Sequence, residues 1–105
     1  MPTGLLGQSA LSATTNTTVY TVPTGNFAVF GVSVCNRGNT TVTVRMSISA
    51  SATPANAEYL EFDAQLGPQG VLERTGLMAG AGRQIVLYTS GTQVSVSIFG
   101  IETTV

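Results

Sequence analysis

Apolar and polar side chains alternate along most of this chain from residue 18 onward. The clearest case is the stretch 41–49, in which every second residue is apolar, namely Val42, Val44, Met46 and Ile48. A period of two residues is typical of a β-strand with one buried face and one face toward solvent. No stretch keeps the 3.6-residue period of an amphipathic helix. The pattern therefore predicts an all-β protein.

Turn-forming residues separate the alternating stretches. Pro23-Thr24-Gly25-Asn26 and Asn36-Arg37-Gly38-Asn39 are the clearest of these breaks, because such residues favour tight turns and tolerate positive φ. The segments between the breaks predict about seven strands, over residues 19–22, 27–35, 41–49, 59–66, 71–77, 84–89 and 94–101. Short strands at this spacing indicate an antiparallel β-sandwich, either immunoglobulin-like or a jelly roll.

The first 17 residues do not share the alternating pattern. They hold a short apolar stretch, Leu5 and Leu6, among Gly and Pro, followed by small hydroxylated residues. Such a segment is expected to form an extended arm that becomes ordered against a neighbour, or else a frayed terminus. The predicted division is an extended N-terminal arm at 1–17 and a β-sandwich domain at 18–105. Deletion of the arm would then leave a folded domain that attaches less firmly to its neighbour.

The stretch 59–66 sets the expected positions of two carboxylates. Alternation turns Leu60 and Phe62 inward and Glu61 and Asp63 outward, which places the two acids about 7 Å apart on one face. Carboxylates at this distance can serve glycoside hydrolysis or hold Ca²⁺. They can also simply keep an exposed strand soluble and prevent edge pairing. No Trp accompanies them, so the solubilising role is favoured.

Composition narrows the chemistry open to the chain. Only 9% of the 105 residues are charged, the net charge is −1, and the sequence has no His, no Lys and a single Cys. Without His or Lys there is no Ser-His-Asp triad, no His metal site and no Schiff-base lysine. We therefore expect that the protein is not an enzyme and that it has no catalytic residues, no cofactor and no metal site. The small net charge gives no attraction to nucleic acid, so no nucleic-acid partner is expected. No apolar run is long enough to span a membrane.

Two further features concern location and assembly. The chain start lacks a basic segment followed by a long apolar run, so no signal peptide is expected, and the lone Cys35 fits synthesis in a reducing cytoplasm. With 43% hydrophobic residues, a small domain has more apolar side chains than its core can bury, so other subunits are expected to cover some of them. The candidate interface residues are Leu5, Leu6, Arg45, Arg74 and Arg83. The arginines could form ion pairs between subunits or within a sheet, or be ordinary surface charges.

Short motifs along nearly the whole chain point to a known group of proteins. They include Leu6-Gly7-Gln8-Ser9-Ala10, Tyr20-Thr21-Val22-Pro23, Asn36-Arg37-Gly38, Tyr59-Leu60-Glu61-Phe62-Asp63 and Glu73-Arg74-Thr75-Gly76. In these motifs the chain resembles small β-rich virion structural proteins of tailed phages, especially marine cyanophages.

The resemblance implies a mechanical role and no catalytic site. It implies a capsid decoration, or cement, protein that is made in the bacterial host cytoplasm and becomes part of the virion. Such a protein would bind the major capsid protein on the outer head and bridge neighbouring capsomers as a homo-oligomer, with a trimer as one form. The alternative is a tail, baseplate or fibre-associated protein that contacts the host surface. For that role, Tyr20, Tyr59 and Tyr88 could offer a sugar-binding surface, or they could serve packing.

Overall fold

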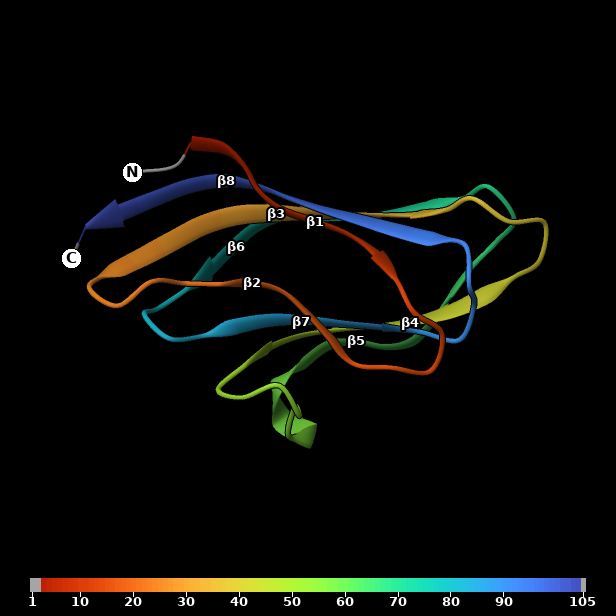
Figure 1. Cartoon of the computed structure of the whole chain (residues 1–105), viewed down its shortest axis with the longest axis horizontal. Coiled ribbons are helices and arrows are strands. Elements are labelled where there is room, and N and C mark those ends of the chain that lie inside the picture. Colours follow the sequence, from red (N-terminus) through yellow and green to blue (C-terminus); the bar gives the residue numbers. More distant parts are fainter. Residues whose placement is uncertain (1–2, 105) are drawn as a thin grey trace.

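The computed structural model describes residues 3–104, and these residues form eight β-strands and one short 3-10 helix (Figure 1). The elements are β1 (Thr3–Leu11), β2 (Thr17–Thr21), β3 (Asn26–Asn36), β4 (Val42–Ser49), η1 (Asn56–Glu58), β5 (Tyr59–Leu66), β6 (Val71–Ala79), β7 (Gln84–Thr89) and β8 (Val94–Thr104). The predicted all-β class is confirmed for the described residues. Their strand count is eight, against the seven or so expected.

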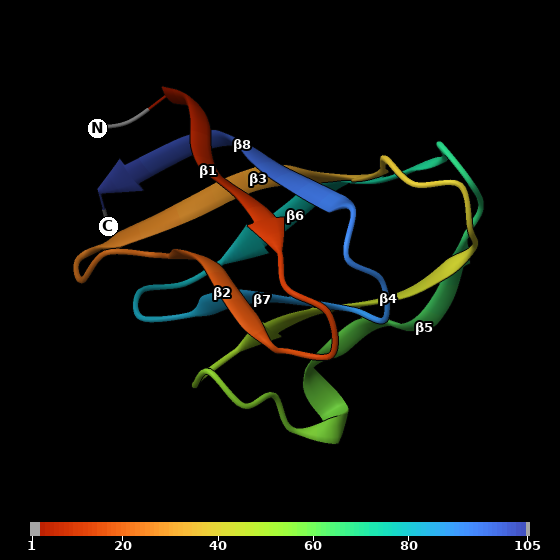
Figure 2. The ribbon, with the colours of Figure 1, turned by 45° about the vertical axis from the view of Figure 1, so that its right-hand side comes forward.

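The strands pair in a nested order. The first pairs with the last, β2 with β7, β3 with β6 and β4 with β5, all antiparallel. Additional pairing of β3 with β8 and of β4 with β7 joins them into two four-stranded sheets. We call the sheet β1-β8-β3-β6 sheet A and the sheet β2-β7-β4-β5 sheet B. Figures 1 and 2 show them as two layers facing each other, which is a β-sandwich.

The core lies between the two sheets, where inward side chains from both layers meet. Sheet A contributes residues such as Val32, Val34 and Ile98, and sheet B contributes Met46 and Leu87, all of them fully buried. The predicted inward face of 41–49 is confirmed, because its apolar residues either are buried or pack against this core. The alternation from residue 18 onward thus identified most of the buried surface correctly.

The strand that the sequence pattern did not predict is β1, which lies within the segment expected to form an arm. Residues Thr3–Leu11 pair along β8, Leu11 is buried in the core, and Leu6 lies at a bulge and packs against the core. Thus the sandwich begins at Thr3, and not at residue 18. Alternation does not reveal this strand because Gly7 lies against β2, where a Cβ would come within 2.6 Å of the Val19 carbonyl oxygen. A strand that approaches another backbone this closely needs glycine in place of an apolar side chain.

A bulge in β5 overturns the predicted faces of that strand. The register against β4 shifts at Phe62 and Asp63, and Asp63 has a φ of 54°, which is uncommon for a non-glycine residue. One extra residue inverts the direction of the side chains on one side of it. Phe62, predicted inward, is therefore 57% exposed. Glu61, predicted to share a face with Asp63, instead forms an ion pair with Arg74 on β6.

Candidate interaction surfaces

An apolar patch covers one half of the outer face of sheet A. It consists of Leu5, Val29, Met78, Phe99 and Ile101, of which all but Val29 are exposed, by 36% to 63%. Leu5 lies opposite Phe99, Ile101 opposite Val29, and Val29 opposite Met78, so the patch crosses all four strands. It lies toward the end of sheet A where β1 begins and β8 ends (Figure 1). None of its side chains is charged.

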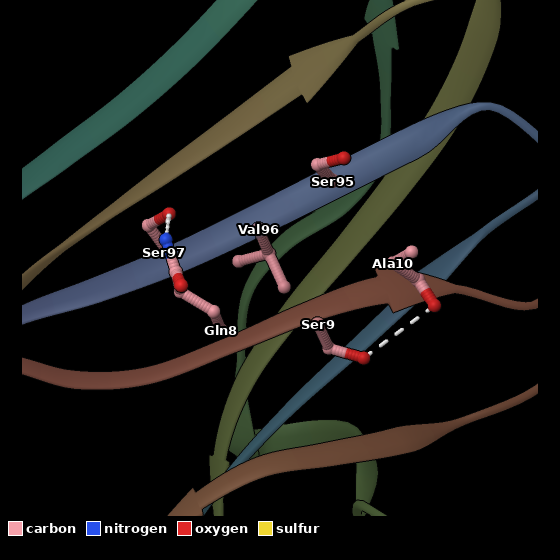
Figure 3. Close-up of a pocket in the computed structure, with 6 residues that line it drawn as sticks. All are labelled: Gln8, Ser9, Ala10, Ser95, Val96 and Ser97. Atoms are coloured by element: carbon pink, nitrogen blue, oxygen red, sulfur yellow. Dashed lines mark hydrogen bonds between the residues drawn. The ribbon is translucent and has the colours of Figure 1, made fainter.

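The other half of this face is mostly polar along β1 and β8, and its β6 edge carries the exposed side chains of Val71 and Glu73. Gln8, Ser9, Ala10, Ser95, Val96 and Ser97 line a shallow pocket of about 300 Å³ between β1 and β8 (Figure 3). The Gln8 amide donates a hydrogen bond of 3.3 Å to the Ser97 hydroxyl. The pocket contains no titratable group, so it can offer hydrogen bonds but no acid–base chemistry.

The three predicted interface arginines all form ion pairs within the chain. Arg45 Nε lies 2.6 Å from Asp63 Oδ1 within sheet B, and Arg83 lies 3.2 Å from Glu58. Arg74 pairs with Glu61 and so links β6 of sheet A to β5 of sheet B. Leu6, as described above, packs against the core. Of the five candidates, Leu5 is therefore the one on the exposed apolar surface.

The outer face of sheet B carries a second feature, which we call the aromatic–arginine cluster (Arg45, Tyr59, Phe62, Asp63 and Tyr88). The guanidinium of Arg45 lies 4.2 Å from the ring centre of Phe62 and 4.5 Å from that of Tyr88. Phe62 and Tyr59 form an edge-to-face pair with ring centres 4.9 Å apart. The sequence did not reveal this cluster, since the bulge that exposes Phe62 has no clear signal in the alternating pattern.

Tyr20, the third candidate for a sugar-binding surface, has a different role. Its hydroxyl donates a hydrogen bond to the buried carboxylate of Glu102, which also accepts one of 3.1 Å from the Asn26 amide. Burial, and then the hydrogen bond and charge of Glu102, raise the pKa of Tyr20 far above its ordinary value, so the phenol keeps its proton. The group ties β2, β3 and β8 together, and it is structural.

Glu58 fixes the loop that connects β4 to η1. Its carboxylate accepts hydrogen bonds from the backbone N–H groups of Ala55 and Ala50, at 2.8 and 3.0 Å, and from the Ser49 hydroxyl at 3.0 Å. These bonds, with a smaller contribution from the nearby Arg83, lower the pKa of Glu58 below its ordinary value. The loop is therefore organised around an ionised carboxylate.

The stability of this loop should depend on pH. Because the pKa of Glu58 is lower in the folded than in the unfolded chain, its stabilising contribution is complete above the unfolded value of 4.5 and disappears as the pH falls through the folded value. We expect Glu58→Gln to unfold at a lower temperature than wild type at pH 7, with the difference narrowing below pH 4.5. Thermal unfolding of both proteins from neutral to acidic pH measures this. A difference that stays constant through the acid range would contradict the role assigned to Glu58.

The structure also bears on the metal and carboxylate sites considered from the sequence. Within residues 3–104, no three His, Cys, Asp or Glu side chains lie close enough to hold a metal ion, and no helix in that range is long and apolar enough to cross a bilayer. Glu61 and Asp63 belong to separate ion pairs, so the paired-carboxylate site considered above does not form. No model of a known protein family matches the chain, and a search of curated proteins gave no match. The two outer sheet faces are thus the features from which function is inferred.

Proposed function

We propose that the chain is a virion structural protein of a tailed phage, and specifically a capsid decoration protein that binds the outer head and bridges neighbouring capsomers. The observation that carries this proposal is the apolar patch on sheet A. Soluble monomers rarely expose contiguous apolar patches larger than a few hundred Å² unless they are interaction sites, and here exposed side chains of β1, β6 and β8 share one face, with the half-buried Val29 between Met78 and Ile101. A protein assembled in many copies would cover this patch.

The strand order supports the same proposal. Four nested antiparallel pairs that roll into two four-stranded sheets correspond to the jelly-roll arrangement, which recurs in viral capsid proteins and in lectins. We therefore propose a jelly roll in preference to an immunoglobulin-like sandwich. Because one fold can host many functions, the order of the strands agrees with a virion role but does not define it.

In this proposal the apolar patch joins copies of the chain into a homo-oligomer, which then binds the major capsid protein. Four strands spaced about 4.8 Å apart and about 30 Å long give a face on the order of 500 Å². The apolar patch is about half of this face, so two patches in contact would bury on the order of 500 Å², which is the size of a weak, transient contact. The absence of charge within the patch means that no like-charge repulsion opposes self-association. Each bridge can be weak, since a head repeats it many times.

A charge placed in the patch should separate the copies. Met78 is the most exposed apolar residue of the patch, at 63%, so Met78→Glu should leave the fold intact while introducing an unpaired charge into the interface. We expect the wild type to sediment as an oligomer and Met78→Glu as a monomer. Val71→Glu is the matched control, because Val71 is similarly exposed at 56% on the same strand but lies at its other end, opposite Cys35. A monomeric wild type, or equal effects of the two variants, would remove the patch from the interface.

A second candidate is a protein of the tail, baseplate or fibre that touches the host surface. The exposed rings of the aromatic–arginine cluster favour it, since aromatic and arginine side chains are enriched at recognition sites. The number of copies per virion separates the candidates. A head protein would be abundant, whereas a tail protein would be present in few copies.

A further inference from the structure

A pocket beside the aromatic–arginine cluster has the size and lining of a small-ligand site. Its volume is about 370 Å³, and it is lined by Asn56 of η1 and by Tyr59 and Phe62 of β5. This volume is at the low end of the range for pockets that bind small molecules. It suits a single ring of a ligand better than an extended ligand.

The apolar wall of the pocket is a ring held rigidly in an exposed position. Phe62 contacts the Arg45 guanidinium and meets Tyr59 edge-to-face. Arg45 is itself fixed by Asp63, through Nε at 2.6 Å and a second contact at 3.4 Å. The bulge that turns Phe62 outward requires Asp63 to adopt a φ of 54°. Backbone conformations of this kind are retained preferentially at functional sites, and a ring fixed before binding loses little entropy on binding.

The polar groups of the pocket determine the chemistry of the ligand. Across the described part of the chain, the Asn56 amide and the Tyr59 hydroxyl make no hydrogen bond, so both are available to a ligand. Arg45 and Asp63 neutralise each other, so the site has no unbalanced charge to attract an ion. The matching ligand is neutral, has one apolar face and carries hydroxyl groups at its rim.

A sugar ring has these properties. The C–H bonds on one face of a pyranose can lie against an aromatic ring, while its hydroxyl groups donate to and accept from amide and phenol groups. We propose that the pocket formed by Asn56, Tyr59 and Phe62 binds a single neutral sugar ring, such as the terminal hexose of a glycan. This site lies on the outer face of sheet B, whereas the apolar patch lies on the outer face of sheet A. A protein assembled through sheet A would therefore keep the pocket accessible.

Titration of the isotope-labelled protein with methyl glycosides of glucose, galactose, mannose and N-acetylglucosamine, followed by NMR, tests the proposal. We expect at least one glycoside to shift backbone signals within residues 56–63 with a millimolar dissociation constant, and Phe62→Ala to weaken binding about tenfold or more. Asn56→Ala should weaken it less. Val71→Ala is the control, because Val71 is exposed almost as much as Phe62 (56% against 57%) but lies on the outer face of sheet A, outside the apolar patch.

Three results would overturn the sugar site. The first is that no glycoside shifts the signals of residues 56–63. The second is that Phe62→Ala binds a glycoside as tightly as wild type does. The third is that the same signals move with protein concentration alone. The last result would identify the cluster as a contact between copies. None of these results depends on the Met78→Glu experiment, so the sugar site and the virion role can fail separately.

Discussion

A chain that starts at residue 12 is expected not to fold into the native sandwich. The deletion removes β1, leaves one side of β8 unpaired, and takes Leu11 out of the core. Loss of one buried leucine side chain costs about 2–5 kcal/mol, against a total stability of about 5–15 kcal/mol for a typical domain. Losing the whole strand should therefore abolish cooperative unfolding, which circular dichroism during heating or urea denaturation would show.

The same strand supplies the control for this deletion. Leu5 points outward from β1 and is 56% exposed, so Leu5→Ser should change the stability by no more than about 0.5 kcal/mol. If the truncated chain instead unfolds cooperatively near the wild-type midpoint, β1 is not part of the stable fold and belongs to an arm, as the predicted arm at 1–17 implied.

Gly100→Ala is expected to be the most destabilising single substitution of a glycine in sheet A. A Cβ at Gly100 would lie 2.1 Å from the Val29 carbonyl oxygen and 2.7 Å from Phe30 Cα. Both atoms belong to the backbone of β3, which pairs with β8 over its whole length, so neither can move without disturbing the ladder. Overpacking of a well-packed interior typically costs 1–3 kcal/mol and occasionally more, and we expect about 3 kcal/mol or more from urea denaturation.

A second glycine serves as the control for Gly100. At Gly80, in the turn after β6, a Cβ would meet no heavy atom within 4 Å. Gly80→Ala should therefore change the stability by no more than about 0.5 kcal/mol. Equal stability of the two variants would mean that β8 and β3 do not approach each other as described.

The sequence predicted correctly those strands in which one alternating set of side chains is apolar and the other set is polar. In the stretch 41–49 the apolar side chains are buried in the core or pack against it, so both the strand and its buried face were predicted correctly, although Ser47 and Ser49 are buried as well. The same holds for the first half of β8, where Val94, Val96 and Ile98 are buried between serines. Burial of one face is sufficient to produce this pattern, and it identifies the fold class.

The second half of β8 shows why the apolar patch was not predicted. The period of two continues, but after Ile98 the large apolar side chains occupy the outward positions instead of the inward ones. Phe99 and Ile101 point outward, while Gly100 and Glu102 take the inward positions. Gly100 is required there by the close approach of β3, and Glu102 is satisfied by its hydrogen bonds. An alternating pattern cannot distinguish the inward from the outward set of side chains when both sets contain apolar residues. Leu5 is therefore the one residue of the apolar patch that the sequence identified as an interface candidate.

The aromatic–arginine cluster was missed for a different reason. Its residues come from three strands, β5, β4 and β7, and they meet only because β4 lies between the other two. Arg45 was singled out for its rarity as a charged residue, but its position between two rings depends on the bulge at Asp63. A bulge of this kind follows from tertiary packing and is not encoded by a turn-forming residue.

The most direct test of the proposed virion role is to locate the protein on particles. On this proposal the chain is encoded by a tailed phage, and purified virions of that phage would be labelled with a gold-conjugated antibody against the chain and viewed by electron microscopy. We expect gold distributed over the outer surface of the head. Gold confined to the tail would favour the second candidate, and particles with no gold on head or tail would contradict a structural role on the virion surface.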